Sequence, residues 1–426
     1  MSVILSNRLY LPYSPQLAEK VKEELTYTIP ARRRGARPTV FKDFFKIRNT
    51  ISVPIGRQDF IPEGAEIIDK RISIPVDIPD ILYTLRPSQQ EAVNLINDNY
   101  VINAIPGYGK TVTALAIVSK LKQKTLIIVH TVALRDQWIR EVQKILGIEP
   151  GIIGSGKYET DKDIVIANIQ SLYKHSDDLK SKFGMVVTDE CHHAPARTFK
   201  EVLDKLKSRY KLGLSGTLIR KDGRHVYMLD YITPFDIYVP QEENILKPEI
   251  VIFPTDFPIS DSGLIPWANK ITALTSIPNY NIIIKRIAEA EAKKGHKVLC
   301  VSDRIQFLEA LGEGIANSLV VTGMYKERSD LERRLSDDID IIFGSISIFK
   351  EGISLNALSC LILATPINND AMLTQLIGRI QRKHEGKLNP IVIDLQYKGK
   401  TAKRQQASRL NLYYSKEYKI HTLNND

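Results

Sequence analysis

Short apolar runs that alternate with amphipathic runs place the strongest limit on how this chain can fold. The helical patterns of residues 111–122 and 134–146 each follow an apolar run and a turn. A strand, a turn and a helix repeated in this order are typical of a parallel sheet. The apolar runs of this series are residues 100–106, 125–130, 163–169, 184–190 and 210–216. We therefore predict one doubly wound α/β domain over residues 81–240.

A second series of the same kind follows the proline-containing, non-periodic stretch 253–266 and opens with the helical pattern of residues 279–294. Its apolar runs are residues 297–302, 318–323, 338–344, 360–366 and 391–395. They predict a second α/β domain over residues 241–426. Residues 1–80 combine short apolar alternations, several prolines and one amphipathic run at 14–25, so we expect a small α+β domain there.

The composition is that of an ordinary globular protein. Hydrophobic residues make up 43% of the 426 residues and charged residues 25%, so each domain can bury a core. No run approaches the roughly 18 apolar residues that span a bilayer, and the start MSVILSNRLY has no signal-peptide pattern. The three cysteines lack CxxC spacing, which argues against a disulfide framework and a cysteine zinc site. We expect a soluble protein of the cytoplasm with reduced thiols.

The charge balance favours a polyanionic partner. The chain carries 59 Lys and Arg against 49 Asp and Glu, a formal net charge of +10. Such a chain attracts nucleic acid before any specific contact forms. The alternative is that the charge only keeps the protein soluble, so it has to be read together with the motifs.

Residues 104–111 match the phosphate-binding pattern GxxxxGK[ST], except that Ala104 stands in place of the first glycine. The match lies between an apolar run and a helical pattern, which is the position such a loop requires. The glycines allow backbone N–H groups to face phosphate, the lysine reaches the β- and γ-phosphates, and the threonine hydroxyl binds Mg²⁺. The alternative is a chance glycine-rich turn. The predicted nucleotide-binding residues of this loop are Gly107, Tyr108, Gly109, Lys110 and Thr111.

Two carboxylates follow a later apolar run, which is the location of a Walker B element in proteins with a phosphate-binding loop of this kind. Asp189 is predicted to hold Mg²⁺, and Glu190 to orient and deprotonate the attacking water. His192 and His193 raise the question of zinc, but neighbouring side chains point apart and no third ligand has suitable spacing. For Cys191 we favour simple packing in the core.

Basic residues near the N-terminus are interleaved with aromatic ones. This pattern can neutralise phosphates while the rings stack on exposed bases. The alternative is that the phenylalanines form the core of the small domain and the arginines lie in a solvated loop. The residues of this pattern are Arg32, Arg33, Arg34, Arg37, Phe41, Lys42, Phe44, Phe45, Lys46 and Arg48.

The motifs together resemble those of superfamily 2 helicases of the DExH type, because they occur in that family's order. His192 and Gln375 form the pairing typical of this type, whereas DEAD-type relatives generally carry Asp and His. The surrounding sequence is similar to the XPB-like and phage UvsW-like group of DNA helicases, and the phage type is the nearest match. The segments that carry the resemblance are residues 85–89, 107–111, 131–138, 167–172, 189–192, 215–217, 298–302, 343–345, 351–353 and 375–382.

The resemblance implies two tandem RecA-like doubly wound domains, ATP and Mg²⁺ as cofactors, and a monomeric motor that binds forked or junction DNA. The residues that it implies are Arg86, Gln89, Gly352 and Gln375 for the nucleotide, His192, Ser215, Gly216 and Thr217 for coupling, Arg135, Gln170, Ser171 and Ser302 for DNA, and Arg379 and Arg382 for the γ-phosphate. Arginines placed there stabilise transition-state charge.

Three functions remain open. The first is an ATP-dependent DNA helicase or branch-migration motor, the second an ATP-driven translocase or remodeller on duplex without net unwinding, and the third a non-catalytic nucleic-acid-binding protein. The intact set of phosphate, Walker B and arginine residues favours the first two over the third. Ser354 stands where many relatives carry Asp, and residues 220–222 depart from the XPB-like pattern, so we transfer no role to either segment.

Overall fold

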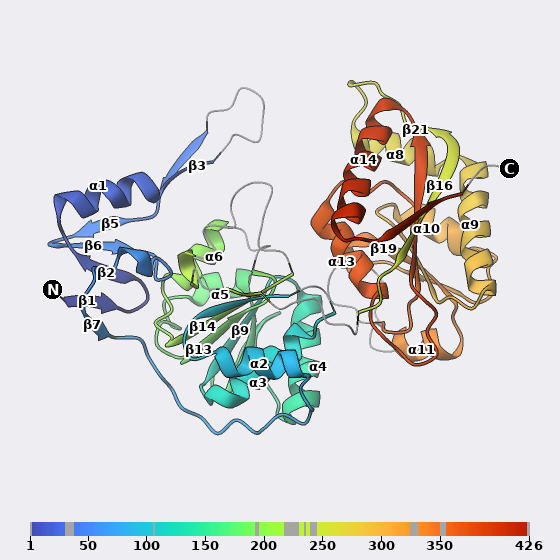
Figure 1. Cartoon of the computed structure of the whole chain (residues 1–426). Helices are drawn as coiled ribbons and strands as arrows, with labels where there is room; N and C mark the ends of the chain where they lie inside the picture. Colours follow the sequence, from blue (N-terminus) through green and yellow to red (C-terminus); the bar gives the residue numbers. More distant parts are fainter. Residues whose placement is uncertain are drawn as a thin grey trace. The chain divides into compact units, whose positions relative to one another are not determined.

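The computed structural model describes residues 2–29, 38–104, 107–191, 196–216, 230–233, 236–238, 245–323, 331–349 and 355–423. The chain forms two compact units, and the boundary between them in the sequence lies between Pro240 and Gln241. Within the first unit the described strands between Ser2 and Asp69 form sheets of their own, separate from the sheet of strands between Tyr100 and Tyr238; we call these parts the N-terminal domain and the first lobe and keep the predicted bounds 1–80 and 81–240 for them. The second unit is a second lobe, residues 241–426, drawn in yellow to red in Figure 1.

The N-terminal domain is a small sheet with one helix, as the sequence predicts. Within its described part, five strands pair in the order β5-β6-β2-β1-β7, and β3 and β4 form a separate antiparallel pair. Helix α1 begins where Ser14 accepts a hydrogen bond from the N–H of Leu17 and proline takes the first helical position. The elements are β1 (Ser2–Leu5), β2 (Leu9–Pro12), α1 (Pro15–Glu24), β3 (Thr26–Ile29), β4 (Thr39–Lys42), β5 (Phe45–Ile47), β6 (Thr50–Val53), a 3-10 turn (Gln58–Phe60) and β7 (Glu66–Asp69).

The first lobe is a doubly wound α/β domain. Among the described residues, eight strands pair in the order β11-β10-β12-β9-β13-β14-β8-β15, and only the β10–β11 pair is antiparallel. Helices α5 and α6 pack on the apolar sheet, whose central strands are wholly buried. The elements are α2 (Pro87–Leu95), β8 (Tyr100–Asn103), α3 (Lys110–Leu121), β9 (Thr125–Val129), α4 (Val132–Leu146), β10 (Gly151–Gly154), β11 (Lys157–Tyr158), β12 (Ile164–Asn168), α5 (Ile169–His175), β13 (Met185–Thr188), α6 (Ala196–Leu203), β14 (Tyr210–Ser215) and β15 (Asp236–Tyr238).

A buried polar network joins the N-terminal domain to the first lobe. Arg8 is 2% exposed, and its guanidinium donates to Asp204 at 2.7 Å and to the backbone carbonyl of Asp43 at 2.9 Å. The Asp43 carboxylate also accepts hydrogen bonds from Lys200 at 2.8 Å and from the hydroxyl of Tyr231. A buried charge is tolerated only when it is paired and hydrogen-bonded, so these contacts fix one arrangement of the two parts.

The second lobe is another α/β domain. In its described part, seven strands pair in parallel in the order β18-β19-β17-β20-β21-β16-β22. The elements are β16 (Glu249–Pro258), α8 (Trp267–Thr275), α9 (Pro278–Lys293), β17 (Val298–Ser302), α10 (Ile305–Gly312), β18 (Ser318–Val321), α11 (Leu331–Asp337), β19 (Ile341–Ser345), α12 (Ile346–Phe349), β20 (Cys360–Leu363), α13 (Asp370–Ile380), β21 (Ile391–Lys398), α14 (Lys400–Ser415) and β22 (Lys419–Thr422).

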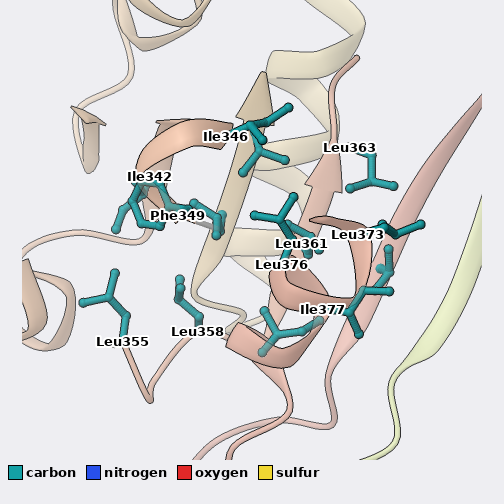
Figure 2. Packing of buried hydrophobic residues seen from close by; sticks show 14 of the residues in the cluster. Ile342, Ile346, Phe349, Leu355, Leu358, Leu361, Leu363, Leu373, Leu376 and Ile377 are labelled. Carbon is teal, nitrogen blue, oxygen red and sulfur yellow. The ribbon is translucent and has the colours of Figure 1, made fainter. Parts of the chain in front are cut away.

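Apolar side chains from α12, α13 and strands β19 and β20 interdigitate in the core of the second lobe, where Phe349 lies among Ile342, Leu361 and Leu376 (Figure 2). Helix α14 is fastened to this lobe by a buried ion pair. Arg409 donates to both carboxylate oxygens of Asp394 on β21, at 2.7 and 2.8 Å. A bidentate pair of this kind fixes orientation as well as distance.

The stretch 253–266, expected to be irregular, is a strand as far as Pro258. Strand β16 pairs with β21 on one side and β22 on the other, and its register shifts between Pro254 and Pro258. Prolines interrupt the local pattern but are tolerated at such an irregularity. All three cysteines are buried thiols without disulfides. None of the helices in the described residues is both long and apolar enough to cross a membrane.

Candidate functional site

The predicted motifs of the first lobe follow the carboxyl ends of five parallel strands, so they lie at one edge of the sheet. Strands β8, β9, β12, β13 and β14 run in the same direction, so the residues that follow them lie along the same edge. In open parallel sheets this edge is where ligands bind. The described residues at and after the ends of these strands are 104, 107–111, 131–135, 168–171, 189–190 and 215–216.

The phosphate-binding loop joins β8 to α3, and its glycines have the backbone conformation that the motif requires. Gly107 and Gly109 have φ of 92° and 91°, and Gly109 caps the first turn of α3. The ammonium of Lys110 donates to the carbonyl of Ala104 at 3.0 Å, so this lysine reaches back along the loop. Thr111 lies in the first turn, where backbone N–H groups and the helix dipole favour an anion.

Gln89, which is predicted to contact the nucleotide, lies against this loop. A side chain at Gly109 would place its Cβ 2.7 Å from Gln89 Nε2 and 3.3 Å from an Arg86 guanidinium nitrogen. The Oε1 of Gln89 accepts a hydrogen bond from the N–H of Arg86 at 3.0 Å at the start of α2. Glycine is therefore needed at residue 109 for space as well as for conformation.

Asp189 directly follows β13 and is half-buried. Burial, and then the charge of Glu190, raise the pKa of Asp189 to about 6, whereas a bond from Trp138 and the charge of Lys110 act in the opposite direction. Glu190 has φ of 44°, a left-handed conformation that costs a non-glycine residue about 1 kcal/mol. Its N–H donates to Asp189 Oδ1 at 2.9 Å. Such local strain is typical of functional sites.

Trp138 is a site residue that the sequence reasoning did not assign. It is 1% exposed on α4, and its indole N–H donates to Asp189 Oδ2 at 2.7 Å. The chain has only two tryptophans, and this one lies on the apolar face of an amphipathic helix. Because a buried indole N–H needs an acceptor, that position could have indicated a polar partner, although not which one.

Arg135, predicted to contact DNA, is 8% exposed and holds three segments together. Its guanidinium donates to Asp136 at 2.8 Å, to the hydroxyl of Ser155 at 2.8 Å and to Asn168 Oδ1 at 3.4 Å. A direct phosphate contact by Arg135 stays a prediction. Gln170 is exposed in the first turn of α5.

Ser215 is buried at the end of β14, and its carbonyl accepts a hydrogen bond from the N–H of Ala104 at 3.0 Å. The predicted coupling segment therefore lies directly beside the strand that leads into the phosphate-binding loop. Gly216 follows it within the described chain. His192 and Thr217 lie outside the described residues, as does Gly352 of the second lobe.

In the second lobe the predicted arginines lie at and beyond the end of α13. Arg379 donates to the carbonyl of Phe349 at 3.0 Å, and Arg382 donates to Asn356 Oδ1 at 3.2 Å. Gln375 is 7% exposed on the same helix. Ser302, predicted to contact DNA, is buried at the end of β17 and accepts a hydrogen bond from the N–H of Arg304 at 3.1 Å.

Comparison with known proteins decides the family. Residues 82–220 match the family model of the type III restriction enzyme res subunit, and residues 279–384 match the helicase conserved C-terminal domain. The chain is 39% identical over 435 aligned residues to "Probable helicase D10" of Escherichia phage T5, an alignment that covers 99% of this chain and 96% of that protein. The chain belongs to the superfamily 2 helicases.

Two more distant comparisons concern the sequence and the fold of this helicase. "ATP-dependent DNA helicase uvsW" of Enterobacteria phage T4 is 26% identical over 344 residues, which cover 72% of this chain and 67% of that protein. The solved structure "S. cerevisiae Dbp5 bound to RNA and ADP BeF3" matches with a TM-score of 0.57 at 13% identity, covering 80% of this chain and 90% of that chain. The tandem RecA-like fold is thus confirmed, and the helicase is an ATP-hydrolysing enzyme related to the UvsW and XPB group.

The aromatic residues in the N-terminal domain of this helicase have different surroundings. Phe44 packs against the domain core, and Phe41 lies under the ammonium of Lys200 at 4.0 Å from the ring centroid. Phe45 is 44% exposed, and the Arg8 guanidinium lies 4.8 Å from its ring centroid. Core packing therefore accounts for Phe44 but not for Phe45. Arg32, Arg33, Arg34 and Arg37 lie outside the described residues.

Proposed function

We propose that this helicase is an ATP-dependent DNA motor that unwinds or branch-migrates forked and junction DNA. The observation that carries the proposal is the single edge of the first lobe, where the phosphate-binding loop, Asp189 and the segment around Gln170 follow parallel strands. This arrangement supports coupling between nucleotide hydrolysis and contact with a strand. The net charge of +10 favours a polyanionic substrate.

The proposed nucleotide chemistry divides between two residues. Lys110 binds the β- and γ-phosphates in the ground state, and Glu190 holds and deprotonates the attacking water. Thr111 and Asp189 offer a hydroxyl and a carboxylate oxygen, donors of the kind that Mg²⁺ prefers. A cation there would also offset the repulsion between Asp189 and Glu190, which raises the pKa of Asp189. When bound, Mg²⁺ neutralises charge on the phosphates.

In the proposed reaction Arg379 and Arg382 stabilise the charge that develops on the γ-phosphate. Gln375 and Gly352 belong to the same proposed nucleotide-contacting set. His192, Ser215, Gly216 and Thr217 remain the proposed coupling residues. Because Ser215 lies next to the strand of the phosphate-binding loop, movement there would be passed to the nucleotide site through one backbone hydrogen bond.

The proposed strand contacts are Gln170 and Ser171 in the first lobe and, in the second, the loop that begins at Ser302, whose own side chain is buried. These contacts fall mainly on phosphates, so movement should be largely independent of sequence. The N-terminal domain is proposed to bind the duplex or junction with Arg32, Arg33 and Arg34. Phe45 and Lys46 are exposed on β5 of that domain and support this proposal.

Strand displacement decides the proposed function. Full-length protein would be incubated with ATP and Mg²⁺ on fluorescently labelled forks, four-way junctions and blunt linear duplexes, with matched RNA substrates in parallel. We expect displacement or branch migration of the DNA forks and junctions, and no displacement by the Lys110→Ala variant. Hydrolysis stimulated by duplex without any strand separation would contradict the proposal, and so would preference for the RNA set.

The proposal that the N-terminal domain binds DNA is tested with point variants and not with a deletion. Removing residues 1–80 would leave Asp204 and Lys200 without Arg8 and Asp43, and so would damage the first lobe. The triple variant Arg32→Ala, Arg33→Ala, Arg34→Ala should weaken junction binding and flatten its salt dependence, while DNA-independent hydrolysis is kept. An unchanged ratio of junction to linear affinity would place the selectivity in the two lobes.

A further inference from the structure

Residues 259–266, here named the tip loop, connect β16 to α8 and expose two consecutive apolar side chains. Leu264 is 95% exposed, the largest exposed fraction among the large hydrophobic residues of the described chain, and Ile265 is 42% exposed. Single exposed apolar residues are ordinary on protein surfaces. Two at the end of a projecting loop indicate a surface that another molecule covers, provided that the loop is held in place.

The tip loop is anchored on the N-terminal side of Leu264, and helix α8 begins at Trp267, three residues after it. Ile259 is buried, and its N–H donates to the carbonyl of Lys398 at 2.8 Å. The carboxylate of Asp261 accepts hydrogen bonds from the N–H groups of Lys400 and Thr401, both at 2.8 Å, which hold the loop on the first turn of α14. Helix α14 is itself fixed to the sheet through Arg409 and Asp394, so the loop rests on a rigid element.

Sheet topology places the tip loop at the edge of the second lobe that carries the predicted strand contact. Strands β16, β21, β20 and β17 are neighbours and all parallel, so the loop after β16 and Ser302 at the end of β17 lie along one edge. Three strand spacings, about 14 Å, separate β16 from β17 across the sheet, and β16 runs about five residues beyond the level of Ser302 before the loop begins. The spacing across the sheet is short compared with the length of a bound strand of several nucleotides.

The surroundings of the tip loop are basic. Lys400, Lys403 and Arg404 are exposed on the first turns of α14, where the loop is attached. Lys270 on α8 lies close enough to Asp261 to contribute to lowering the pKa of that carboxyl, after the backbone bonds from Thr401 and Lys400. An apolar tip beside cationic side chains suits a partner with apolar faces and a negatively charged backbone, which describes nucleic acid.

We propose that the tip loop packs Leu264 and Ile265 against exposed bases at the junction of paired and unpaired strands, while Lys400, Lys403 and Arg404 contact the flanking phosphates. Leucine and isoleucine are among the side chains that proteins insert between base steps. The inference rests on the proposed function, since it requires a nucleic-acid strand along this edge of the second lobe.

A base analogue reports this contact separately from unwinding. A fork with 2-aminopurine as its last paired base would be titrated without ATP, using wild type, the double variant Leu264→Ala, Ile265→Ala, and Leu82→Ala as a control. Leu82 is 70% exposed in the first unit, so the control removes another largely exposed leucine far from the tip loop in the sequence. We expect fluorescence to rise with wild type and Leu82→Ala, because the base unstacks, and to stay flat with the double variant.

Strand displacement and salt dependence provide the second readout. The double variant should displace forked strands about tenfold more slowly, while its ATP turnover on linear single strands stays within about twofold of wild type. Lys403→Ala with Arg404→Ala should lower the slope of log affinity against log salt by about 2, as expected for two lost phosphate contacts.

A double variant that unstacks the base as wild type does would overturn the tip-loop inference and leave the proposed function intact. If the variant Lys403→Ala with Arg404→Ala kept the wild-type salt slope, the proposed phosphate contacts of these two residues would be ruled out. If wild type unstacks the base but displaces no strand, the proposed function fails while the tip-loop contact stands.

Discussion

Lys200 donates a hydrogen bond to Asp43 at 2.8 Å, and this bond joins helix α6 of the first lobe to the segment between β4 and β5 of the N-terminal domain. Helix α6 begins seven residues after Asp189 in the sequence. The N-terminal domain therefore supports the helix that follows the proposed catalytic carboxylates in the sequence, and the effect of its buried ion pairs on stability can be tested directly.

Asp43→Ala should destabilise the first unit strongly. The side chain of Asp43 is fully buried, and its loss leaves Arg8 and Lys200 without their shared carboxylate, at a cost of about 3 kcal/mol. Urea unfolding measures this loss of unfolding free energy. Asp77→Ala is the control, because Asp77 is fully exposed beside Lys122, and it should not shift the midpoint. Equal midpoints for the two variants would show that the network contributes little.

Asp230 should make stability depend on pH. Burial raises its pKa to about 6, although the Tyr27 hydroxyl donates to its carboxylate at 2.6 Å and opposes the rise. Since the unfolded pKa is about 3.9, the folded state binds more protons between these values. The stabilisation is present below about pH 4 and is lost as pH rises through about 6.

Asp230→Asn should therefore show a flatter fall in unfolding free energy between about pH 4 and pH 6 than wild type. Tyr27→Phe should move the fall to higher pH, because the bond that favours the ionised carboxylate is gone. Urea midpoints at successive pH values measure both variants. If the urea midpoints of both variants changed with pH as those of wild type do, Asp230 would not be the source of the pH dependence of stability.

Lys110→Ala and Glu190→Gln should both abolish DNA-stimulated ATP turnover but differ in nucleotide binding. Lys110 is proposed to contact phosphate before the reaction, whereas Glu190 acts on water. Titration with a fluorescent nucleotide should show weaker binding only for Lys110→Ala. Equal losses of binding would refute this division of roles.

Trp138→Phe should raise the Mg²⁺ concentration needed for half-maximal turnover by about tenfold, since a hydrogen bond that orients Asp189 is lost. Phenylalanine keeps most of the buried aromatic volume, so the fold should persist. Trp267→Phe serves as the matched control. An unchanged magnesium dependence in Trp138→Phe would limit Trp138 to a packing role.

Arg382→Ala should leave ATP affinity nearly intact and lower turnover by roughly 10³, as found where an arginine stabilises the transition state. Lys383→Ala, at the neighbouring position, should have little effect on turnover. Steady-state kinetics with a separate binding titration distinguish the two effects. Turnover close to wild type in Arg382→Ala would rule out the proposed arginine finger.

Local sequence predicted most strands and helices of both lobes and the position of the phosphate-binding motif. Strands such as β9, with five consecutive buried residues, and the turn at Gly107 and Gly109 depend on neighbours in the chain, so periodicity and glycine spacing were sufficient to predict them. The same reasoning missed strand β16 and described residues 253–266 as non-periodic, because the pairing of β16 with the distant β21 outweighs its prolines.

Tertiary structure alone decided which polar groups meet. Trp138 and Asp189 are 51 residues apart, and Lys200 and Asp43 are 157 apart, so no local pattern could pair them. Such contacts form only after packing of apolar surface has removed water and left each buried donor in need of an acceptor. The sequence by itself thus determined the helicase motifs, whereas packing decided how Asp189 is held and how the N-terminal domain is attached.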